Sequence, residues 1–271
     1  MSKSFLKCKD NIFDLAKFTY VQNKDGIVRL STRDYQRKVL TLMQLPPICG
    51  NKRNLILKQP RQSGSTIEAI LFLMHKLLFE EGVTITVVST KLARACEIVG
   101  KIAFSLKNLP AEWYNDGLSI KFKKGEIRNT TTDSVILAKS YGTLDNVENF
   151  RKDNLVTHKY LITPRVNYMF LDDFAFATKE QQEHIVKVIF PTITCGVFNK
   201  IIISSATNGT ENSFYKLCVE AMGAKSPFLM VEIPWWDVYN FNVKEMKTRA
   251  DQIGARAWMR EYGLFFDDYE D

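Results

Sequence analysis

The first strongly apolar segment of the chain leads into residues with the chemistry to bind phosphate. Residues 54–58 (NLILK) are predicted to form a buried strand, and residues 59–66 (QPRQSGST) connect it to a helix predicted over residues 67–80. Backbone amides in such a loop, together with the positive end of the helix dipole, hold phosphate groups. The general P-loop pattern requires glycine at position 59 and lysine at position 65, where this chain has Gln59 and Ser65. Taken alone, the loop is equally typical of an ordinary strand-to-helix turn with a Ser/Thr cap.

A second apolar strand ends in two adjacent acidic residues. Residues 168–171 (YMFL) are followed directly by Asp172 and Asp173. This is the form of a Walker B segment, in which the first carboxylate helps to hold Mg²⁺ and the second orients the attacking water. Paired acids at a strand end are also common as plain solvated turn residues.

A third apolar strand runs into small polar residues. Residues 201–203 (III) are followed by Ser204, Ser205 and Ala206, and then by Thr207, Asn208 and Gly209. Such a polar end can sense the γ-phosphate of a nucleotide, although Asn-Gly is equally a turn signal. The three strand ends together are far more informative than any one of them.

The elements that must position these residues alternate along the chain. Strands are predicted at residues 54–58, 84–89, 168–171, 200–204 and 228–233, and helices at 67–80, 92–106, 179–188, 211–222 and 243–262. Two segments of alternating residues between 119 and 139 add antiparallel strands. This order predicts an α/β fold with a mainly parallel sheet flanked by helices. Ligands of such sheets bind beyond the carboxyl ends of the strands, where the three polar segments lie.

Composition limits the class of protein. The chain has 271 residues, of which 45% are hydrophobic and 25% charged, so disordered, collagen-like and fibrous classes are excluded. Lys and Arg outnumber Asp and Glu by 37 to 30, and the net charge of +7 favours a polyanionic partner. No apolar run reaches the ~18 residues of a membrane span, and no secretory signal opens the chain. We therefore expect a cytoplasmic protein without a membrane partner.

In their order along the chain, these segments resemble the ATPase domain of the large terminase subunit of tailed bacteriophages, the motor that packages DNA into procapsids. The resemblance extends from about residue 30 to about residue 266. Residues 33–37 (RDYQR) are similar to the family's adenine-recognition segment, and residues 60–66 to its own form of Walker A. Residues 169–177 (MFLDDFAFA) are similar to its Walker B and the residues that follow, and residues 205–215 (SATNGTENSFY) to its coupling segment.

The resemblance implies a P-loop NTPase of the RecA/ASCE type that uses ATP and Mg²⁺. It implies that Thr66 and Asp172 hold the metal and that Asp173 is the catalytic base, with Arg61 and Lys58 acting on the phosphates. The remaining residues implied to bind nucleotide are Arg33, Tyr35, Gln36, Gln62, Ser63, Gly64, Ser65 and Thr66. Thr207, Asn208 and Gly209 are implied to couple the state of the phosphates to motion.

Two departures from the family pattern affect this expectation. Ser65 stands where the family usually has the Walker A lysine, and Asp173 stands where it usually has a glutamate. Lambda-type terminases look to carry the lysine three residues before the Walker A arginine, which is the position of Lys58 relative to Arg61. Our hypothesis is that Lys58 replaces the missing lysine. Asp173 is one methylene shorter than glutamate, so attenuated hydrolysis is expected.

The resemblance implies a motor that translocates double-stranded DNA, with the procapsid portal and the small terminase subunit as partners. Such motors act as homo-oligomeric rings, here in the cytoplasm of an infected host cell, and Arg151 is one candidate for an arginine supplied to a neighbouring subunit. The sequence does not assign DNA-binding residues, because the basic clusters at residues 121–128 and 244–260 are typical of solvated faces.

We expect residues 1–271 to form a single ATPase domain, with residues 1–30 as an N-terminal extension and residues from about 235 to 271 as a C-terminal helical lid or linker. The nuclease domain of the family is expected to be absent from this chain, and DNA cleavage with it. Two alternatives remain open. One is a nucleotide-binding terminase homologue with attenuated or lost hydrolysis, and the other is a helicase-like remodeller.

Overall fold

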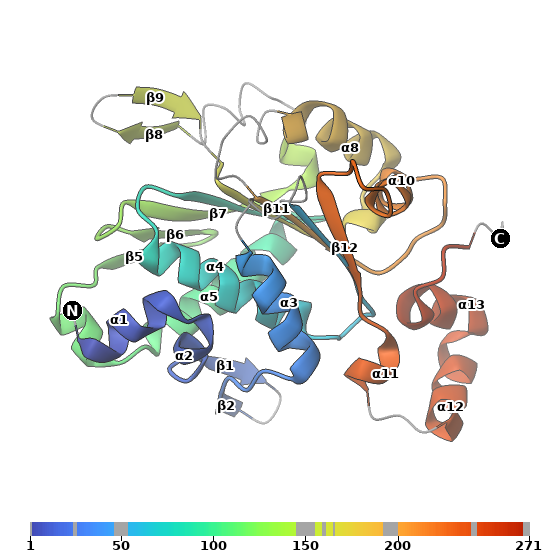
Figure 1. Ribbon diagram of the computed structural model, residues 1–271, viewed down its shortest axis with the longest axis horizontal. Coiled ribbons are helices and arrows are strands. Elements are labelled where there is room, and N and C mark those ends of the chain that lie inside the picture. The colour runs from blue at the N-terminus through green and yellow to red at the C-terminus, as the bar shows by residue number, and fades with distance from the viewer. Residues whose placement is uncertain are drawn as a thin grey trace.

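A mainly parallel sheet forms the centre of the molecule (Figure 1). The computed structural model describes residues 2–23, 26–45, 54–144, 155–158, 161–164, 166–191, 200–239 and 243–267. Within these residues the main sheet has eight strands in the order β12-β3-β11-β10-β4-β7-β6-β5. These strands are β3 (Asn54–Lys58), β4 (Thr84–Ser89), β5 (Ile120–Lys123), β6 (Glu126–Asn129), β7 (Ser134–Ser140), β10 (Tyr168–Asp172), β11 (Lys200–Ser205) and β12 (Phe228–Glu232).

The pairing of the strands confirms the predicted fold class. From β12 to β7 all neighbours are parallel, whereas β6 pairs antiparallel with β7 and β5 antiparallel with β6. The antiparallel part therefore extends one edge of a parallel sheet, as the sequence indicates. Two hairpins lie outside this sheet, formed by β1 (Tyr20–Asn23) with β2 (Gly26–Arg29) and by β8 (Leu155–His158) with β9 (Leu161–Pro164).

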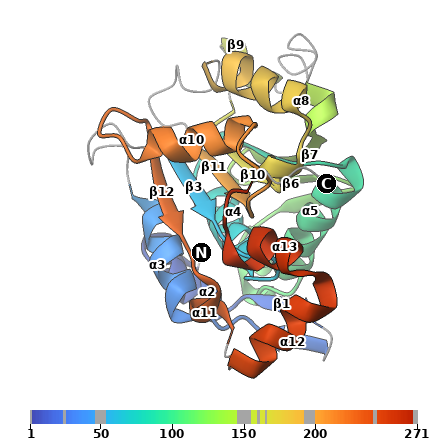
Figure 2. The ribbon, with the colours of Figure 1, turned by 90° about the vertical axis from the view of Figure 1, so that its right-hand side faces the viewer.

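Helices cover both faces of the sheet (Figures 1 and 2). One layer contains α1 (Lys3–Asp10), α2 (Ile12–Ala16), α3 (Asp34–Gln44), α4 (Ser65–Phe79), α5 (Leu92–Lys107) and α6 (Ala111–Asn115). The other contains the turns η1 (Tyr141–Leu144) and η2 (Phe174–Phe176), helix α8 (Lys179–His184) with its π-helical continuation η3 (Ile185–Ile189), and α10 (Ser213–Ala221). The C-terminal segment comprises residues 235–239 and 243–267 of the described chain. It contains α11 (Trp235–Val238), α12 (Val243–Ile253), α13 (Ala255–Trp258) and the π-helical turn η4 (Met259–Gly263). None of the described helices combines the length and the apolar character that a bilayer span demands.

Alternation along each strand explains why the central strands are apolar throughout. Leu55 and Leu57 of β3 pack into the core beneath α4, whereas Ile56 packs into the core beneath α10. Successive side chains point to opposite faces of a sheet, and both faces are covered here. Polar residues are therefore confined to the strand ends, which is where the candidate site lies.

Helix α4 is the centre of the first layer. From Glu68 to His75 every residue is buried, and the helix is apolar on nearly all sides. A helix of this kind must be enclosed by other elements. The N-terminal helices provide part of that enclosure, because Phe5 of α1 packs its ring 4.8 Å from Phe79 and 5.0 Å from Trp113. Residues 3–16 thus belong to the same core as α4, which the sequence did not indicate.

Two predicted elements are interrupted in the structure. The helix predicted over residues 243–262 breaks at Gly254, whose φ of +86° lies in a region that glycine adopts without strain. The first alternating segment after residue 119 is two strands, β5 and β6, which turn at Gly125 with a φ of +74°. In both cases a single glycine divides one predicted element into two, although the residues on both sides keep the same hydrophobic pattern.

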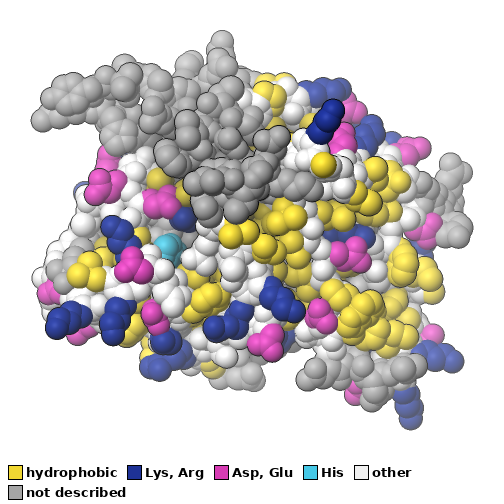
Figure 3. All heavy atoms as spheres, viewed as in Figure 1, with side chains coloured by type: hydrophobic (Ala, Val, Ile, Leu, Met, Phe, Trp, Pro, Cys, Tyr) yellow, Lys and Arg dark blue, Asp and Glu magenta, His cyan; other side chains and the backbone are white. Residues whose placement is uncertain are grey.

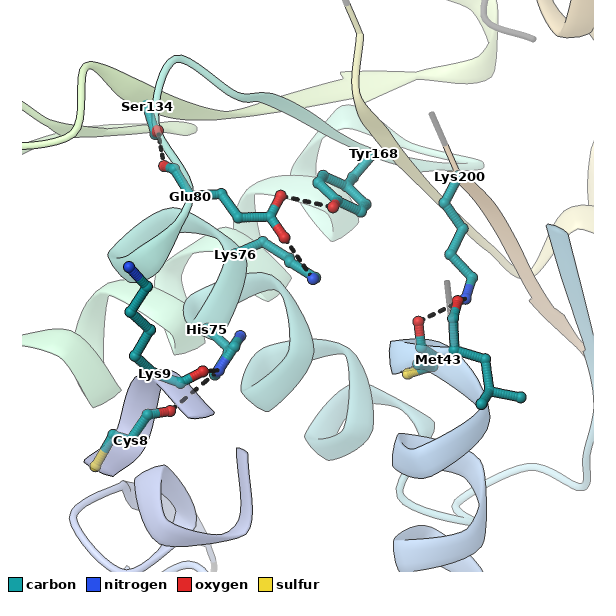
Figure 4. Close-up of polar contacts among 10 residues, drawn as sticks. Cys8, Lys9, Met43, His75, Lys76, Glu80, Ser134, Tyr168 and Lys200 are labelled. Atoms are coloured by element: carbon teal, nitrogen blue, oxygen red, sulfur yellow. Dashed lines mark hydrogen bonds and ion pairs between the residues drawn. The ribbon is translucent and has the colours of Figure 1, made fainter. Parts of the chain in front are cut away.

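A polar network ties the elements together at the amino ends of the strands, away from the candidate site (Figure 4). Tyr168 donates to the carboxylate of Glu80 at 2.6 Å, and Lys76 pairs with the same carboxylate at 2.6 Å. The Nε2 atom of His75 lies 3.1 Å from the backbone oxygens of both Cys8 and Lys9. These contacts join α1, α4 and β10, and all of them are structural.

Lys200 joins the start of β11 to the end of α3. Its Nζ atom donates to the backbone oxygens of Met43 at 2.6 Å and of Leu42 and Leu45 at 3.2 Å (Figure 4). The last carbonyls of a helix have no partners within the helix, and a cation there also interacts favourably with the helix dipole. Burial lowers the pKa of Lys200 to about 8.

We predict that Lys200→Met lowers the free energy of unfolding by about 1–3 kcal/mol, because the carbonyls of Met43, Leu42 and Leu45 lose a charged donor and the bond to Met43 is buried. The measurement is chemical denaturation at pH 7, where the ammonium is charged. Lys187→Met is the matched control, since Lys187 is exposed and pairs only across one helical turn with Glu183; its effect stays within about 0.5 kcal/mol. Equal or greater stability of Lys200→Met would show that desolvation of the ammonium outweighs its hydrogen bonds.

Candidate active site

The three polar segments meet at the carboxyl ends of neighbouring strands. In the sheet order β3-β11-β10, the loop after Lys58, the end of β11 and the acids after β10 lie side by side. They line one cavity of about 350 Å³, formed by Gln59, Pro60, Arg61, Gln62, Gly64, Ser65, Thr66, Arg94, Asp172, Asp173, Ser204, Ser205 and Ala206. Most of the positions expected from the sequence to act lie in this cavity or directly around it.

Seven of the predicted residues line the cavity itself, namely Arg61, Gln62, Gly64, Ser65, Thr66, Asp172 and Asp173. Tyr35 and Gln36 contact the loop at Ser63 and Gly64. The other predicted residues, namely Arg33, Lys58, Thr207, Asn208 and Gly209, are not part of the lining. The structure therefore brings the predicted phosphate, metal and acid residues together in one place. Arg151 lies outside the described residues.

The loop after β3 has the backbone of an anion-binding turn. Gln62 and Gly64 adopt positive φ angles of 59° and 94°, and Gly64 directly precedes the first turn of α4. A Cβ atom at Gly64 would lie 2.7 Å from Nε2 of Gln36, so no other residue fits without displacing that side chain. Left-handed residues beside a helix N-terminus expose successive backbone N–H groups, which is a feature of phosphate-binding loops.

Gln59 occupies the position where the general P-loop pattern has glycine. Its side chain is buried and donates from Nε2 to the hydroxyl of Ser204 at 3.1 Å, while its backbone N–H donates to Ser205 at 3.1 Å. The residue therefore fastens the start of the loop to β11. This contact was not foreseen, because only the strand order places β3 and β11 next to each other.

The predicted adenine-recognition residues stand at the start of α3 and touch the same loop. Tyr35 donates its hydroxyl proton to the backbone oxygen of Ser63, and Gln36 donates from Nε2 to that of Gly64 at 3.4 Å. Oε1 of Gln36 accepts from the backbone N–H of Arg33 at 3.0 Å. Beside them lies a second cavity, lined by Arg33, Asp34, Tyr35, Lys38, Asp237, Val238, Tyr239, Glu245 and Arg249.

The two acids after β10 have different surroundings. Asp172 is only 4% exposed, and its Oδ2 atom accepts from Ser89 at 3.1 Å and lies 3.5 Å from Nε of Arg94. Burial, together with the charge of Asp173, raises the pKa of Asp172 to about 6. Asp173 has a left-handed backbone with a φ of +53°, and its N–H donates to the backbone oxygen of Ser204 at 2.9 Å.

The oxygen groups in this cavity suit Mg²⁺. The carboxylate of Asp172 and the hydroxyls of Ser65 and Thr66 line the same space. Mg²⁺ prefers hard oxygen ligands and is bound by one or two carboxylates together with water and substrate phosphates. The buried position of Asp172 also makes its negative charge unfavourable unless a cation lies nearby. These residues therefore fit the metal that the sequence implies.

The C-terminal segment lies against the candidate site (Figure 2). Arg61 donates from its backbone N–H to the backbone oxygen of Glu261 at 2.9 Å, and its side chain lies 3.5 Å from the carboxylate of Glu261. The guanidinium groups of Arg61 and Arg260 each lie 5.8 Å from the centre of the Phe176 ring. The loop after β3 and the turn after β10 thus share contacts with η4.

The predicted coupling residues connect the same parts. The hydroxyl oxygen of Thr207 lies 2.8 Å from the backbone oxygen of Arg260 and 2.7 Å from that of Phe265, so it can donate to either. Asn208 donates from Nδ2 to the backbone oxygen of Ala175 at 3.0 Å, next to Phe176. Gly209 has a φ of +75°. This segment therefore links the turn after the two acids to the C-terminal segment.

Lys58 has different contacts from those expected of a phosphate-binding lysine. Its Nζ atom pairs with Glu232 of β12 at 2.8 Å and lies 4.9 Å from the centre of the Phe266 ring. It does not contribute to the lining of the cavity that contains Ser65. In the described conformation, Lys58 joins β3, β12 and the C-terminal segment.

Arg94, Ser89 and Tyr141 contact the acids and were not among the predicted site residues. Tyr141 donates its hydroxyl proton to the backbone oxygen of Asp172 at 2.8 Å. Ser89 ends β4, and Arg94 lies in the first turn of α5. Since β4 pairs with β10, its carboxyl end reaches the same edge of the sheet. The strand order alone reveals these residues, because nothing in their spacing marks them.

Glu68 is a buried carboxyl group directly behind the phosphate-binding loop. It is fully buried in the first turn of α4, and burial raises its pKa to about 8. A carboxyl whose pKa is higher in the folded than in the unfolded protein weakens the fold as pH rises between the two values. Here that range extends from about 4.5 to about 8.

We predict that Glu68→Gln stabilises the protein at pH 8 by on the order of 3 kcal/mol, and that this gain shrinks as pH falls towards 5. The amide keeps the shape of the side chain and cannot ionise. Urea denaturation of both proteins across this pH range is the measurement. Glu220→Gln, on the exposed surface of α10, is the control and should change stability little at any pH. A gain independent of pH would contradict the prediction.

Comparison with solved structures identifies the fold. No protein-family model matches the sequence. The ATPase domain of the large terminase of Thermus phage P74-26 is similar with a TM-score of 0.61 and 18% identity, over 85% of this chain and 98% of that one. The large terminase of bacteriophage HK97 is similar with a TM-score of 0.68 and 13% identity, over 97% of this chain and 55% of that one.

Two further structures bear on the nucleotide and on the alternatives. The large terminase of a thermophilic bacteriophage, in complex with ATP-γ-S, is similar with a TM-score of 0.61 and 11% identity, over 87% of this chain and 53% of that one. The UvsW helicase of bacteriophage T4 is similar with a TM-score of 0.50 and 12% identity, over 83% of this chain and 67% of that one. The resemblance found in the sequence is thus confirmed at the level of the fold, and the chain has the fold of the ATPase domain of phage large terminases.

Proposed function

We propose that the chain is the ATPase domain of a viral large terminase, which hydrolyses ATP to translocate double-stranded DNA into procapsids. The single observation that carries this proposal is the cavity at the ends of β3, β11 and β10. It brings a phosphate-type loop and two acids together, with the coupling segment beside them, in a fold shared with terminase ATPase domains. In this proposal residues 1–271 are one domain, in which residues 1–30 extend the core and residues from about 235 form a C-terminal lid or linker.

ATP is proposed to lie with its triphosphate on the loop of residues 59–66 and its base towards Tyr35. The positive φ angles of Gln62 and Gly64 support the first part, because left-handed residues beside a helix N-terminus are a feature of phosphate-binding loops. The position of the base is supported by the contacts of Tyr35 and Gln36 with the loop. Because Tyr35 also lines the second cavity, that cavity lies next to the loop proposed to bind the triphosphate. The large terminase solved in complex with ATP-γ-S has the same fold.

Hydrolysis requires a water molecule that attacks the γ-phosphate and a base that accepts its proton. Asp173 is proposed as this base, because it lines the cavity beside Asp172 and its left-handed backbone is fixed by Ser204. Burial raises the pKa of Asp173, while Arg61 and Arg94 oppose that effect. When bound at Asp172 and Thr66, Mg²⁺ would neutralise phosphate charge. Asp173 is shorter than the usual glutamate, and we therefore propose a slow rate of turnover.

Coupling is proposed to pass through Thr207, Asn208 and Gly209 to the C-terminal segment. Asn208 holds the turn that follows Asp173, and Thr207 holds the backbone at Arg260 and Phe265. A change in the position of either acid would therefore be transmitted to η4. Arg61 adds a second connection, since it contacts Glu261 with both backbone and side chain.

DNA is proposed to bind through its phosphate backbone and without sequence recognition. The net charge of +7 supports a polyanionic partner. On the face shown in Figure 3, Lys and Arg side chains are scattered among acidic ones and form no single basic surface among the described residues. A ring of several copies fits this arrangement, because weak contacts from each copy add together. We further propose that the procapsid portal and the small terminase subunit are its partners, and that it acts in the cytoplasm of an infected cell.

We predict that Asp173→Asn lowers the rate of ATP turnover by roughly 100-fold or more while nucleotide affinity changes little, because the amide cannot accept a proton. Asparagine also tolerates the left-handed backbone of this position. The measurement is steady-state ATPase activity with and without double-stranded DNA, alongside equilibrium binding of ATP-γ-S. Asp251→Asn, on the exposed side of α12, is the control. Unchanged turnover of Asp173→Asn would exclude the proposed base.

Lys58 remains the proposed substitute for the Walker A lysine only if its ion pair with Glu232 opens when nucleotide binds. We predict that Lys58→Ala then weakens ATP binding and turnover together, whereas Glu232→Gln, which releases Lys58 from its partner, leaves both intact. Titration with ATP-γ-S and the steady-state rate test this. Unchanged affinity and turnover in Lys58→Ala would assign Lys58 to the connection between β3 and β12 alone.

The alternatives are separated by the same measurements. Ser65 and Asp173 favour a homologue that binds nucleotide without turnover, and wild-type protein would then bind ATP-γ-S but release no phosphate from ATP. The fold shared with the UvsW helicase favours a helicase-like remodeller. That function predicts strand separation of a forked duplex, whereas a packaging motor moves along an intact one.

A further inference from the structure

We propose that Arg94 supplies the positive charge on the γ-phosphate that the loop lacks at Ser65. This inference rests on the proposed ATPase function, and it assigns a phosphate-binding role to a residue outside the three recognised segments. Among the described residues that line the cavity, the cations are Arg61 and Arg94. Arg94 differs from Lys58 because it lines the cavity, and from Arg61 because it lies beside Asp172.

Arg61 and Lys58 are both directed towards the C-terminal half of the chain. The side chain of Arg61 is 53% exposed and lies beside Glu261 and Phe176. Lys58 pairs with Glu232, outside the lining of the cavity. Lys58 must therefore leave Glu232 and change direction before it can contact a phosphate at Ser65, whereas Arg61 lines the cavity but has its guanidinium next to Glu261.

Arg94 approaches from the opposite side, next to the candidate metal ligand. Its Nε atom lies 3.5 Å from Oδ2 of Asp172, and its Nη1 atom donates to Glu97 at 2.8 Å. These contacts use two of its three nitrogen atoms and leave Nη2 without a partner among the described residues. A guanidinium held in this way keeps donors for a phosphate oxygen, which it binds through short charge-assisted hydrogen bonds.

The strand order gives Arg94 its place. Only two residues separate the end of β4 from the start of α5, and β4 is the neighbour of β10, which ends in Asp172. A cation in the first turn of a helix is disfavoured by the helix dipole, and the first turn of α5 contains no acid. Asp172 offsets this cost in the protein without nucleotide. A bound triphosphate would offset it further.

Binding of the metal would then release Arg94 towards the nucleotide. In the absence of other cations, Arg94 is the charged partner of the buried carboxylate of Asp172. A divalent cation held by Asp172 would compete with Arg94 for its carboxylate. The guanidinium would thereby exchange its carboxylate partner for a phosphate bound in the same cavity. Glu97, which stays bound to Nη1, would keep its orientation throughout.

A purely structural role for Arg94 makes a different prediction. If Arg94 only neutralises Asp172, its removal changes ATP and ADP affinity by the same factor. If it binds the γ-phosphate, the loss falls on ATP, because ADP lacks that group. The ratio of the two affinities therefore separates the roles, and stability does not affect this ratio.

The experiment compares wild type, Arg94→Ala, Arg94→Lys and Lys101→Ala in equilibrium binding of ATP-γ-S and ADP with Mg²⁺. Lys101→Ala is the matched control, because Lys101 also pairs with Glu97 on α5, at 2.7 Å, but does not line the cavity. We expect Arg94→Ala to weaken ATP-γ-S binding by roughly tenfold or more relative to ADP, and Arg94→Lys to recover part of the loss. Lys101→Ala should match wild type.

The outcomes distinguish this inference from the function on which it rests. Wild-type protein that binds neither nucleotide contradicts the proposed function. Wild-type protein that binds both, with an unchanged affinity ratio in Arg94→Ala, overturns the role of Arg94 alone. A selective loss of ATP-γ-S binding in Lys58→Ala but not in Arg94→Ala also overturns it, in favour of Lys58. Should Arg94→Ala fail to fold, Arg94→Gln provides the same comparison with a side chain of similar length.

Discussion

The hydrogen-bonded register of three parallel strands fixes the candidate site. Ser204 of β11 stands opposite Leu57 of β3 on one side and Asp172 of β10 on the other. The pairing continues past the strand ends, because Gln59 donates to Ser205 and Asp173 donates to Ser204. A shift of one strand by a single residue would move each of its side chains to the opposite face of the sheet, and so into the other core. The loop, the acids and the coupling segment are therefore aligned before any nucleotide arrives.

This alignment places two ionisable carboxyl groups in buried positions. Asp172 and Glu68 are both buried, and burial raises the pKa of each carboxyl. The two differ in what surrounds them, since Asp172 has Arg94 and Ser89 as partners, whereas the side chain of Gln59 only partly offsets the effect of burial on the pKa of Glu68. Charge is thus retained on the acid that faces the cavity and disfavoured on the acid behind the loop. This distribution of charge favours a cation at Asp172, and it favours the uncharged form of Glu68 in the first turn of α4.

The sequence alone predicted the strands of the main sheet and the loops that carry the site, because apolar runs and polar ends are local properties; it did not predict the hairpins β1-β2 and β8-β9. The sheet class and the grouping of Gly64, Thr66, Asp172 and Asp173 followed from them. What could not be predicted depends on which strands become neighbours. Gln59 reaches Ser204, and Arg94 reaches Asp172, only because β11 lies between β3 and β10 and because β4 lies beside β10. The contact between Lys58 and Glu232 has the same origin, since β12 pairs with β3.

The C-terminal segment shows how such neighbours extend the site beyond the sheet. Leu264 turns the chain with a φ of +59° and is buried, so the residues on either side face different elements. Before the turn, Glu261 contacts Arg61 of the loop. After it, Phe265 accepts from Thr207, and the ring of Phe266 packs 4.9 Å from that of Tyr215 and next to Lys58. One short segment thus contacts both the phosphate-binding loop and the coupling segment. In the proposed function, a nucleotide that draws the guanidinium of Arg61 away from Glu261 would loosen this segment on the side of the loop while Thr207 still holds it on the other side, and a change at the phosphates would there become movement.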